Sequence, residues 1–234
     1  MLKFSPANTK LKKLAKKTGK KVYSLDLQAG VSCPFARDCK SQVIETPNGL
    51  RIQDGRYTQF RCYAASGEVL FTPAYRVHRN NYLAIKQAKS VKRIKKLILD
   101  SLPHDAGIIR LHSSGDFFSK NYFKAVLEVC QETPHIRWYG YTKALPYLVQ
   151  YTLPKNLRLV ASYGGKCDSY IEEYKLVSCK VVYSKNEAKK AKLSLDTNDF
   201  LCYNARKSFG VLIHGTQPQG SLAAAALSII RKKS

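Results

Sequence analysis

The run Gly107-Ile108-Ile109-Arg110-Leu111-His112-Ser113-Ser114-Gly115-Asp116 reads as a short apolar strand that ends in polar turn residues. A helical pattern follows over residues 119–131, and the next apolar run, 136–142, predicts a strand again. The alternation continues through strands predicted at 156–162, 180–184 and 209–214, after a first strand at 22–28. Strand and helix alternating at this spacing are typical of a parallel sheet. The sequence therefore predicts an α/β fold in which six strands form an incomplete (β/α) barrel or an open, mostly parallel sheet.

The chain has 234 residues, which is the length of one domain. Residues 1–25 carry eight lysines and no acidic residue. We therefore expect a basic N-terminal arm over residues 1–21, followed by a single α/β domain over 22–234. Within this domain the spacing of apolar residues predicts a helix over 74–99, with lysines and arginines on its other face.

Composition limits the classes of protein that need to be considered. Hydrophobic residues make up 44% of the chain, which excludes a disordered protein. No apolar run approaches the ~20 residues that span a bilayer, and no secretory signal is visible, so we expect a cytoplasmic protein that does not enter a membrane. The formal net charge of +24 predicts a polyanion or a small anionic substrate as partner.

Polar residues that follow the predicted strands are candidates for a site, since ligands of parallel sheets bind at the carboxyl ends of the strands. His112 is expected to act as a general acid or base, or to hydrogen-bond a cofactor. Asp116 either acts with it or caps the following helix. The catalytic candidates are His112, Ser114, Asp116 and Lys143, and the candidates for contacts with a cofactor are Tyr63, Ser162, Tyr163 and His214.

The seven cysteines are an odd number, which argues against a disulfide scaffold. Cys130 in a helical pattern and Cys179 at the start of a strand are expected in the core, whereas the setting of Cys167 does not decide its role. The remaining four lie beside turn formers: Cys33, Cys39, Cys62 and Cys202. The C-x5-C spacing of the first two fits neither paired zinc knuckles nor a ferredoxin run. Spacing alone therefore leaves zinc, an iron–sulfur cluster or free thiols open.

The order of several motifs resembles that of a family of phage proteins, the gene product eighty-eight family. The motifs are Ser32-Cys33-Pro34, Cys39, Cys62-Tyr63-Ala64, Ile109 to Asp116, Ile136-Arg137-Trp138, Asn156 to Ser162 and Leu201-Cys202-Tyr203. The resemblance implies a [4Fe–4S] cluster, a distant relation to radical S-adenosylmethionine barrels and a location in the host cytoplasm. It implies Cys33, Cys39, Cys62 and Cys202 as cluster ligands. The C-x3-C-x2-C loop of radical enzymes is absent, so we do not expect their chemistry.

The function depends on whether three or four cysteines ligate the cluster. Four thiolates suit electron transfer or a structural role, whereas three leave one iron free as a Lewis acid for hydrolysis or hydration. We expect four ligands and an enzyme, with hydrolysis of an ester-like bond as the reaction class if an iron is free. The alternatives are an electron-transfer protein and a nucleic-acid-binding protein whose cluster is structural, because basic runs lie near residues 10–21 and 86–96.

Overall fold

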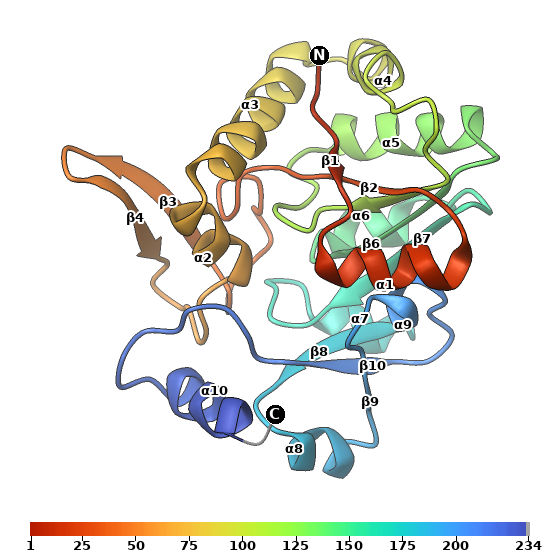
Figure 1. The fold of residues 1–234 in the computed structure, drawn as a ribbon. Coiled ribbons are helices and arrows are strands. Elements are labelled where there is room, and N and C mark those ends of the chain that lie inside the picture. Colours follow the sequence, from red (N-terminus) through yellow and green to blue (C-terminus); the bar gives the residue numbers. More distant parts are fainter. Residues whose placement is uncertain (233–234) are drawn as a thin grey trace.

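A computed structural model describes residues 1–232, which form an eight-stranded sheet, a two-stranded hairpin and ten helices (Figure 1). The strands of the large sheet are β1 (Ser5–Pro6), β2 (Val22–Leu25), β5 (Ile108–Leu111), β6 (Arg137–Thr142), β7 (Leu157–Ser162), β8 (Ser178–Val182), β9 (Ser194–Leu195) and β10 (Phe209–Leu212). The hairpin consists of β3 (Ser41–Thr46) and β4 (Gly49–Asp54). The helices are α1 (Thr9–Thr18), α2 (Tyr63–Leu70), α3 (Thr72–Ala88), α4 (Val91–Leu99), α5 (Lys120–Glu132), α6 (Leu145–Gln150), α7 (Ser169–Glu173), α8 (Lys185–Lys190), α9 (Phe200–Tyr203) and α10 (Leu222–Lys232).

The strand order is β1-β2-β5-β6-β7-β8-β10-β9, and every neighbouring pair is parallel except β1 with β2. From β2 to β8 each new strand is added on the same side of the previous one, whereas β10 returns to lie between β8 and β9. Crossovers between parallel strands are almost always right-handed, so crossovers that advance in one direction place their helices on one face of the sheet. The outer strands β1 and β9 do not pair with each other, so the sheet is open. The prediction of a single α/β domain with an open, mostly parallel sheet is confirmed.

Residues of the sheet alternate between two hydrophobic clusters. One face packs against α3, α4, α5 and α6 through residues such as Ile94, Phe123 and Trp138. The opposite face packs against α1 and α9, and Tyr139 belongs to this second cluster. Because side chains at successive positions of a strand point to opposite faces, neighbours Trp138 and Tyr139 join different clusters. Burial of each large side chain contributes about 1.5–3 kcal/mol.

The segment expected to be a basic arm contains β1 and α1, and both belong to the folded domain. Asn8 begins α1, since its Oδ1 accepts a hydrogen bond of 3.0 Å from the backbone amide of Leu11. Leu11 and Leu14, three positions apart, share one helix face and are each 1% exposed against the sheet. The lysines therefore occupy the other face of α1, so the segment is both basic and packed.

The predicted helix over 74–99 is two helices, so this prediction was wrong. Lys89 has φ +57°, which interrupts the helix after Ala88. Ser90 then begins α4, because its Oγ accepts a hydrogen bond of 3.3 Å from the amide of Arg93. The apolar periodicity runs through the break because both helices pack on the same cluster. The segment between Cys39 and Cys62, for which no strand was predicted, contains the β3–β4 hairpin.

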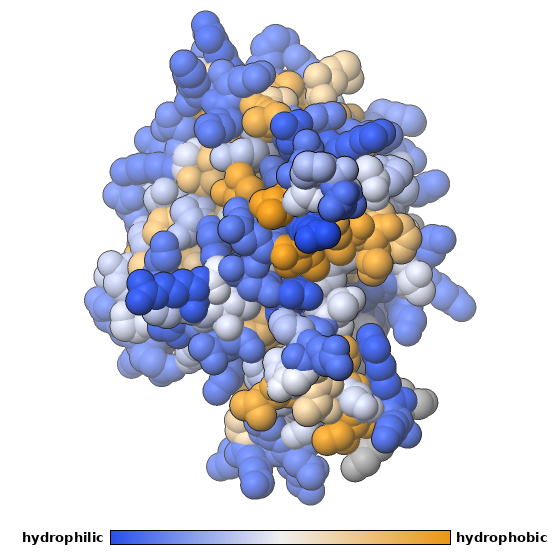
Figure 2. Space-filling model, turned by 90° about the vertical axis from the view of Figure 1, so that its left-hand side faces the viewer, coloured by the Kyte–Doolittle hydropathy of each residue, from blue (hydrophilic) through white to orange (hydrophobic). Residues whose placement is uncertain are grey.

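Basic residues lie almost entirely at the surface. Among residues 1–232, Arg110 is the one lysine or arginine side chain that is buried. Hydrophilic side chains accordingly cover most of the face shown in Figure 2, with hydrophobic residues in smaller patches between them. Within the same residues no helix is long and apolar enough to cross a bilayer.

Candidate functional site

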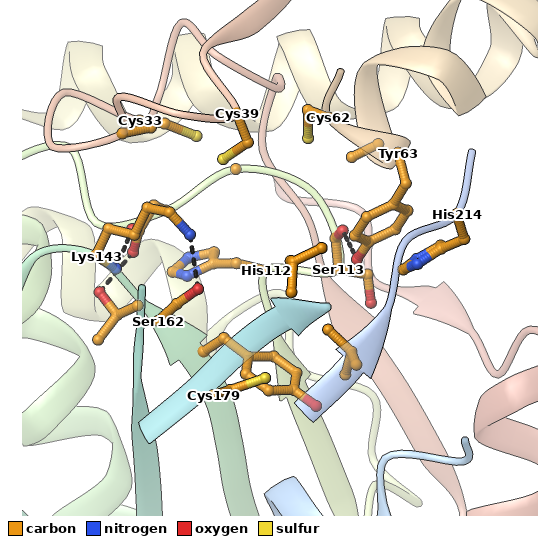
Figure 3. Close-up of a pocket in the computed structure, with 18 of the residues that line it drawn as sticks. Cys33, Cys39, Cys62, Tyr63, His112, Ser113, Lys143, Ser162, Cys179 and His214 are labelled. Carbon is orange, nitrogen blue, oxygen red and sulfur yellow. Dashed lines mark hydrogen bonds between the residues drawn. The ribbon is translucent and has the colours of Figure 1, made fainter. Parts of the chain in front are cut away.

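A pocket of about 220 Å³ lies at the carboxyl ends of the parallel strands, and Cys33, Cys39 and Cys62 line it. The three cysteines lie in a row along one side of the pocket (Figure 3). His112, Lys143 and Ser162 face them from the ends of β5, β6 and β7. The structure therefore brings together three of the four predicted ligands and three of the residues predicted at the strand ends.

The β3–β4 hairpin explains how two cysteines far apart in sequence reach the same pocket. The hairpin leaves after Cys39 and returns the chain before Cys62. The amides of Gln59 and Phe60 both donate hydrogen bonds to the carbonyl of Asp38, at 2.7 and 3.1 Å. These bonds join the returning chain to the residue that precedes Cys39.

The loop that carries Cys33 and Cys39 is fixed to the end of β7. The amides of Arg37 and Asp38 donate hydrogen bonds of 3.0 and 2.9 Å to the carbonyl of Gly164. Gly164 has φ +89°, which favours glycine, and a Cβ atom there would lie 3.1 Å from Asp38. Lys40 holds the other end, since its Nζ donates to the carbonyl of Cys33 at 2.7 Å. The cysteine loop is thus tied to the sheet edge that carries the pocket.

The three cysteines are partly buried beside one another, and this affects the protonation of Cys33 and Cys62. Burial, and then the neighbouring Cys39, raises the pKa of Cys62 to about 12. The pKa of Cys33 is also raised, chiefly by burial and then by Asp116 and the other two thiols. Cys33 and Cys62 therefore remain neutral thiols near neutral pH unless a cation binds, because burial and neighbouring thiolates disfavour the charged form.

Lys143 is the cation that faces these thiols. Burial alone would lower the pKa of Lys143, but the attraction of Cys39 and Asp116 outweighs it and the pKa is raised. Its Nζ donates a hydrogen bond of 2.6 Å to Ser162 Oγ. Asp116 fixes the backbone here by accepting hydrogen bonds from the Lys143 amide at 2.8 Å and from Thr142 Oγ1 at 2.7 Å. Lys143 therefore stays an ammonium ion at neutral pH.

Asp116 was also considered as a helix cap, and this alternative was wrong. Ser119 begins α5, since its Oγ accepts a hydrogen bond of 3.2 Å from the amide of Tyr122. Asp116 lies three residues earlier and uses its carboxylate for the turn after β6. The helix begins where the pattern over residues 119–131 predicted it, and Phe117 and Phe118 lie between the turn and α5.

His112 lines the pocket at the end of β5 and is 5% exposed. Its Nε2 is 2.8 Å from the hydroxyl of Tyr122. Its buried Nδ1 has no hydrogen-bond partner within residues 1–232. Burial, and then the charge of Arg110, lowers the pKa of His112 to about 3. The imidazole is therefore neutral at physiological pH, and one of its ring nitrogens has no protein partner in the described residues.

We expect His112 to make the protein less stable in acid. Its pKa is lowered from 6.5 to about 3 in the folded state, so between these values the unfolded chain binds more protons. The contribution of neutral His112 to the free energy of unfolding is complete above pH 6.5. It is lost as the pH falls toward 3, by up to about 1.4 kcal/mol per pH unit. Asparagine at position 112 tolerates the φ of +61° and cannot titrate. Urea midpoints measured from about pH 7 to about pH 4 should converge between wild type and His112→Asn. A difference that stays constant over this range would contradict the assignment.

Tyr63 and His214 form a further wall of the pocket. Their rings lie 4.5 Å apart at an angle of 32°. The Tyr63 hydroxyl donates to the carbonyl of Ser113, and His214 Nδ1 lies 2.9 Å from the carbonyl of Leu212. Gly215, with φ +80°, lets the last loop approach closely, because a Cβ atom there would lie 2.9 Å from Tyr63 Cα. The chain after β10 is thereby held against the first turn of α2.

A buried ion cluster forms another part of the pocket lining. Arg110 Nε donates to Asp199 Oδ2 at 2.8 Å, and Lys10 Nζ lies 2.6 Å from Asp199 Oδ1. Burial alone would raise the pKa of Asp199, but Arg110 and Lys10 outweigh it and lower the pKa to about 2. Tyr141 packs under the guanidinium of Arg110, whose central carbon lies 4.7 Å from the ring centroid.

Cys202 does not reach the pocket. It lies in α9, is fully buried, and belongs to the cluster that packs this helix against the sheet. Its neighbours include Arg110, Asp199 and Cys179, whereas the other three predicted ligands neighbour one another. Its amide donates to Asp196 Oδ2 at 3.1 Å. The structure therefore does not bring Cys202 to the other predicted ligands, because α9 turns its cysteine toward the core.

Ser114 and Tyr163 also do not line the pocket. Ser114 Oγ donates a hydrogen bond of 2.8 Å to the buried Glu68. Glu68 Oε1 also lies 2.8 Å from His78 Nδ1, so Ser114 belongs to a network that joins α2, α3 and the turn after β5. The hydroxyl of Tyr163 donates to Glu172 in α7. Both residues follow strand ends but point away from the pocket.

Comparison with known families gives a match over almost the whole chain. A family model described as gene product 88 matches residues 2–232. The chain belongs to this family. The expected membership of a phage gene-product family is thereby confirmed. Comparisons with curated proteins and with solved structures found no match.

Several pocket residues of this gene product 88 family protein were not singled out from the sequence. Arg110 precedes His112 by two positions, and strand alternation would have placed both on one face. Cys179 was expected in the core; it is buried and also lines the pocket, across from the row of three cysteines (Figure 3). Lys10 and Asp199 come from α1 and from the turn before α9, and no local pattern pointed to either.

Proposed function

We propose that this gene product 88 family protein is an iron–sulfur enzyme in which Cys33, Cys39 and Cys62 hold a [4Fe–4S] cluster. The observation that carries the proposal is the row of three thiols along one side of a pocket at the strand ends. Parallel sheets bind their ligands at this edge. Two separate segments supply the thiols, and dedicated hydrogen bonds hold both segments in place.

The chemistry of the donor set supports a cluster. The raised pKa values of the Cys33 and Cys62 thiols favour a site where a cation displaces their protons. Within residues 1–232 no three His, Cys, Asp or Glu side chains are spaced as ligands of one metal ion. The thiolates of a cubane each bind a different iron and can therefore be further apart than the ligands of zinc. The ammonium of Lys143 offsets negative charge on this side of the pocket.

Three protein ligands rather than four favour an enzyme over an electron carrier. Cys202 lies in the core, and Cys179 lies across the pocket from the row. When bound, a cluster with one iron free of protein ligands supplies a Lewis acid beside the substrate. The remaining functions fall to side chains of this chain that line the same pocket.

The charged residues of the pocket favour a small anionic substrate. Lys10 and Arg110 pair with Asp199, and Arg61 pairs with Asp54 at 2.6 Å. The ammonium of Lys143 has no carboxylate within ion-pair distance in the described part of the chain, so it is available to an anionic group. The neutral His112 offers Nδ1 for one hydrogen bond. The reaction class that we propose is hydrolysis of an ester-like bond in such a substrate.

Anaerobic purification followed by iron and sulfide analysis tests the cluster. We expect about four of each per chain and a brown protein. Titration with esters that carry a carboxylate should change the electronic spectrum of the cluster if the free iron and the substrate share the pocket. A colourless anaerobic preparation would contradict the cluster, whereas a brown protein whose spectrum ignores every ester would contradict the hydrolase only.

A further inference from the structure

A second group of cations lies at the opposite end of the sheet from the pocket. Arg137 begins β6, and Arg158 is the second residue of β7. The register pairs Tyr139 with Arg158, so Arg137, Tyr139 and Arg158 lie on the same face of neighbouring strands. This is the face on which α1 and α9 pack. Both arginine side chains are half-buried, so a ligand from solvent can reach them.

The donors of these two arginines are largely unused. Arg137 Nη1 donates a hydrogen bond of 2.9 Å to the carbonyl of Lys155. The Nε atom of Arg158 is buried and has no acceptor within residues 1–232. Neither guanidinium forms an ion pair with a carboxylate in that part of the chain. An arginine carries five donors, and a buried donor without an acceptor is costly, so binding of an anion to this pair would be favourable.

The surroundings of the two arginines add positive charge and an aromatic wall. Burial lowers the pKa of Arg137, and the neighbouring charge of Arg158 lowers it further. The guanidinium of Arg137 lies over the ring of Tyr203, with 5.8 Å to the centroid. Phe200 stacks on Tyr203 at 6.4 Å, and Lys17 Nζ of α1 lies 3.2 Å from the centroid of Phe200. The rings of Phe200 and Tyr203 in α9 therefore lie between Lys17 of α1 and Arg137.

We propose that Arg137 and Arg158 bind a phosphate group at the amino ends of β6 and β7. A planar guanidinium matches two oxygens of a phosphate, and two guanidinium groups on one face can bind one phosphate together. The phosphate belongs either to a nucleic-acid backbone or to a small phosphate compound. This site is separate from the cysteine pocket, and it does not depend on the cluster.

Binding of three probes distinguishes a phosphate of a nucleic-acid backbone from that of a small compound. The probes are inorganic phosphate, adenosine monophosphate and a fluorescent single-stranded DNA, each measured with the full chain. Phosphate should raise the melting temperature of the wild type, because a ligand of the folded state stabilises it. Tight DNA binding that weakens steeply with salt assigns the site to nucleic acid. Binding of the two small probes with no preference for DNA assigns it to a small phosphate compound.

Arg158→Gln should weaken binding of the preferred probe by about tenfold or more, since a hydrogen bond to a charged group is lost. The matched control is Arg93→Gln on α4, an exposed arginine on the other side of the sheet, which should leave binding almost unchanged. Arg158→Lys keeps the charge but loses the planar fork, so it should bind more weakly than the wild type. Without ligand, Arg158→Gln should melt at the same or a higher temperature, because an unpaired buried donor is removed.

Three results would overturn the proposal. The first is that none of the three probes binds. The second is that Arg158→Gln, or Arg137→Gln where the former does not fold, binds as the wild type does. The third is that Arg93→Gln weakens binding as much as Arg158→Gln, which would show attraction by the net charge of +24 rather than a built site.

Discussion

Replacing Cys33, Cys39 or Cys62 by alanine, one at a time, is expected to abolish the iron–sulfur cluster. Each variant retains only two thiolates of the row, and two are too few because a cubane needs protein ligands on at least three of its four irons. Iron and sulfide in the anaerobic protein should fall from about four to less than about one per chain. Far-ultraviolet circular dichroism should show that the sheet remains, because these three positions lie outside the two hydrophobic clusters that pack on the sheet.

Cys202→Ala and Cys179→Ala are the matched controls, since they remove buried thiols from the same domain. Cys202 lies in the core under α9, and Cys179 lies across the pocket from the row (Figure 3). Both variants should keep the cluster, with some loss of stability because each leaves a small cavity. Loss of iron in Cys202→Ala but not in Cys62→Ala would show that the cluster lies elsewhere. Loss in none of the five variants would show that cysteine does not ligate iron here.

The strand pattern was sufficient to predict the sheet. Apolar runs such as Ile108–Leu111 and Leu157–Ser162 are strands in the structure, and their parallel pairing follows from the helices between them. The segment before β2 was harder to interpret. Its lysines dominate the composition, and only two leucines three positions apart show that α1 packs on the sheet. A short helix with so few apolar residues gives a weak periodic signal.

The location of a residue after a strand predicted the site only in part. His112 and Lys143 do face the pocket, whereas Ser114 points to Glu68 on the other side of the same turn. The direction of a side chain in a turn depends on local dihedral angles, and His112 itself has φ +61°. The periodicity of apolar residues in the sequence does not predict such dihedral angles. Cys202 fits a sequence motif equally well, yet a single turn of helix directs it into the core.

Asp199→Ala is expected to destabilise the protein by about 3–5 kcal/mol, because it leaves the buried guanidinium of Arg110 without its counter-charge. The Arg110 and Asp199 side chains are each 4% exposed and are joined by a hydrogen bond of 2.8 Å.

The same ion pair predicts a pH dependence of stability. The pKa of Asp199 is lowered from 3.8 to about 2, so in this window the unfolded chain binds more protons. The contribution of Asp199 is therefore complete above about pH 4 and is lost as the pH falls through about 2.

Two further variants separate the charge from the shape of this site. Asp199→Asn keeps the side-chain size and tolerates the φ of +61°, so any loss of stability reports the missing charge. The double variant Asp199→Asn/Arg110→Met should recover most of the lost stability, since replacing both members of a buried ion pair often changes stability little. Lys10 is 37% exposed, so Lys10→Gln should cost less than about 1 kcal/mol. Urea unfolding followed by circular dichroism measures all four variants. If Asp199→Asn and Lys10→Gln had equal effects, Arg110 would not depend on Asp199, and the buried pair would contribute little to stability.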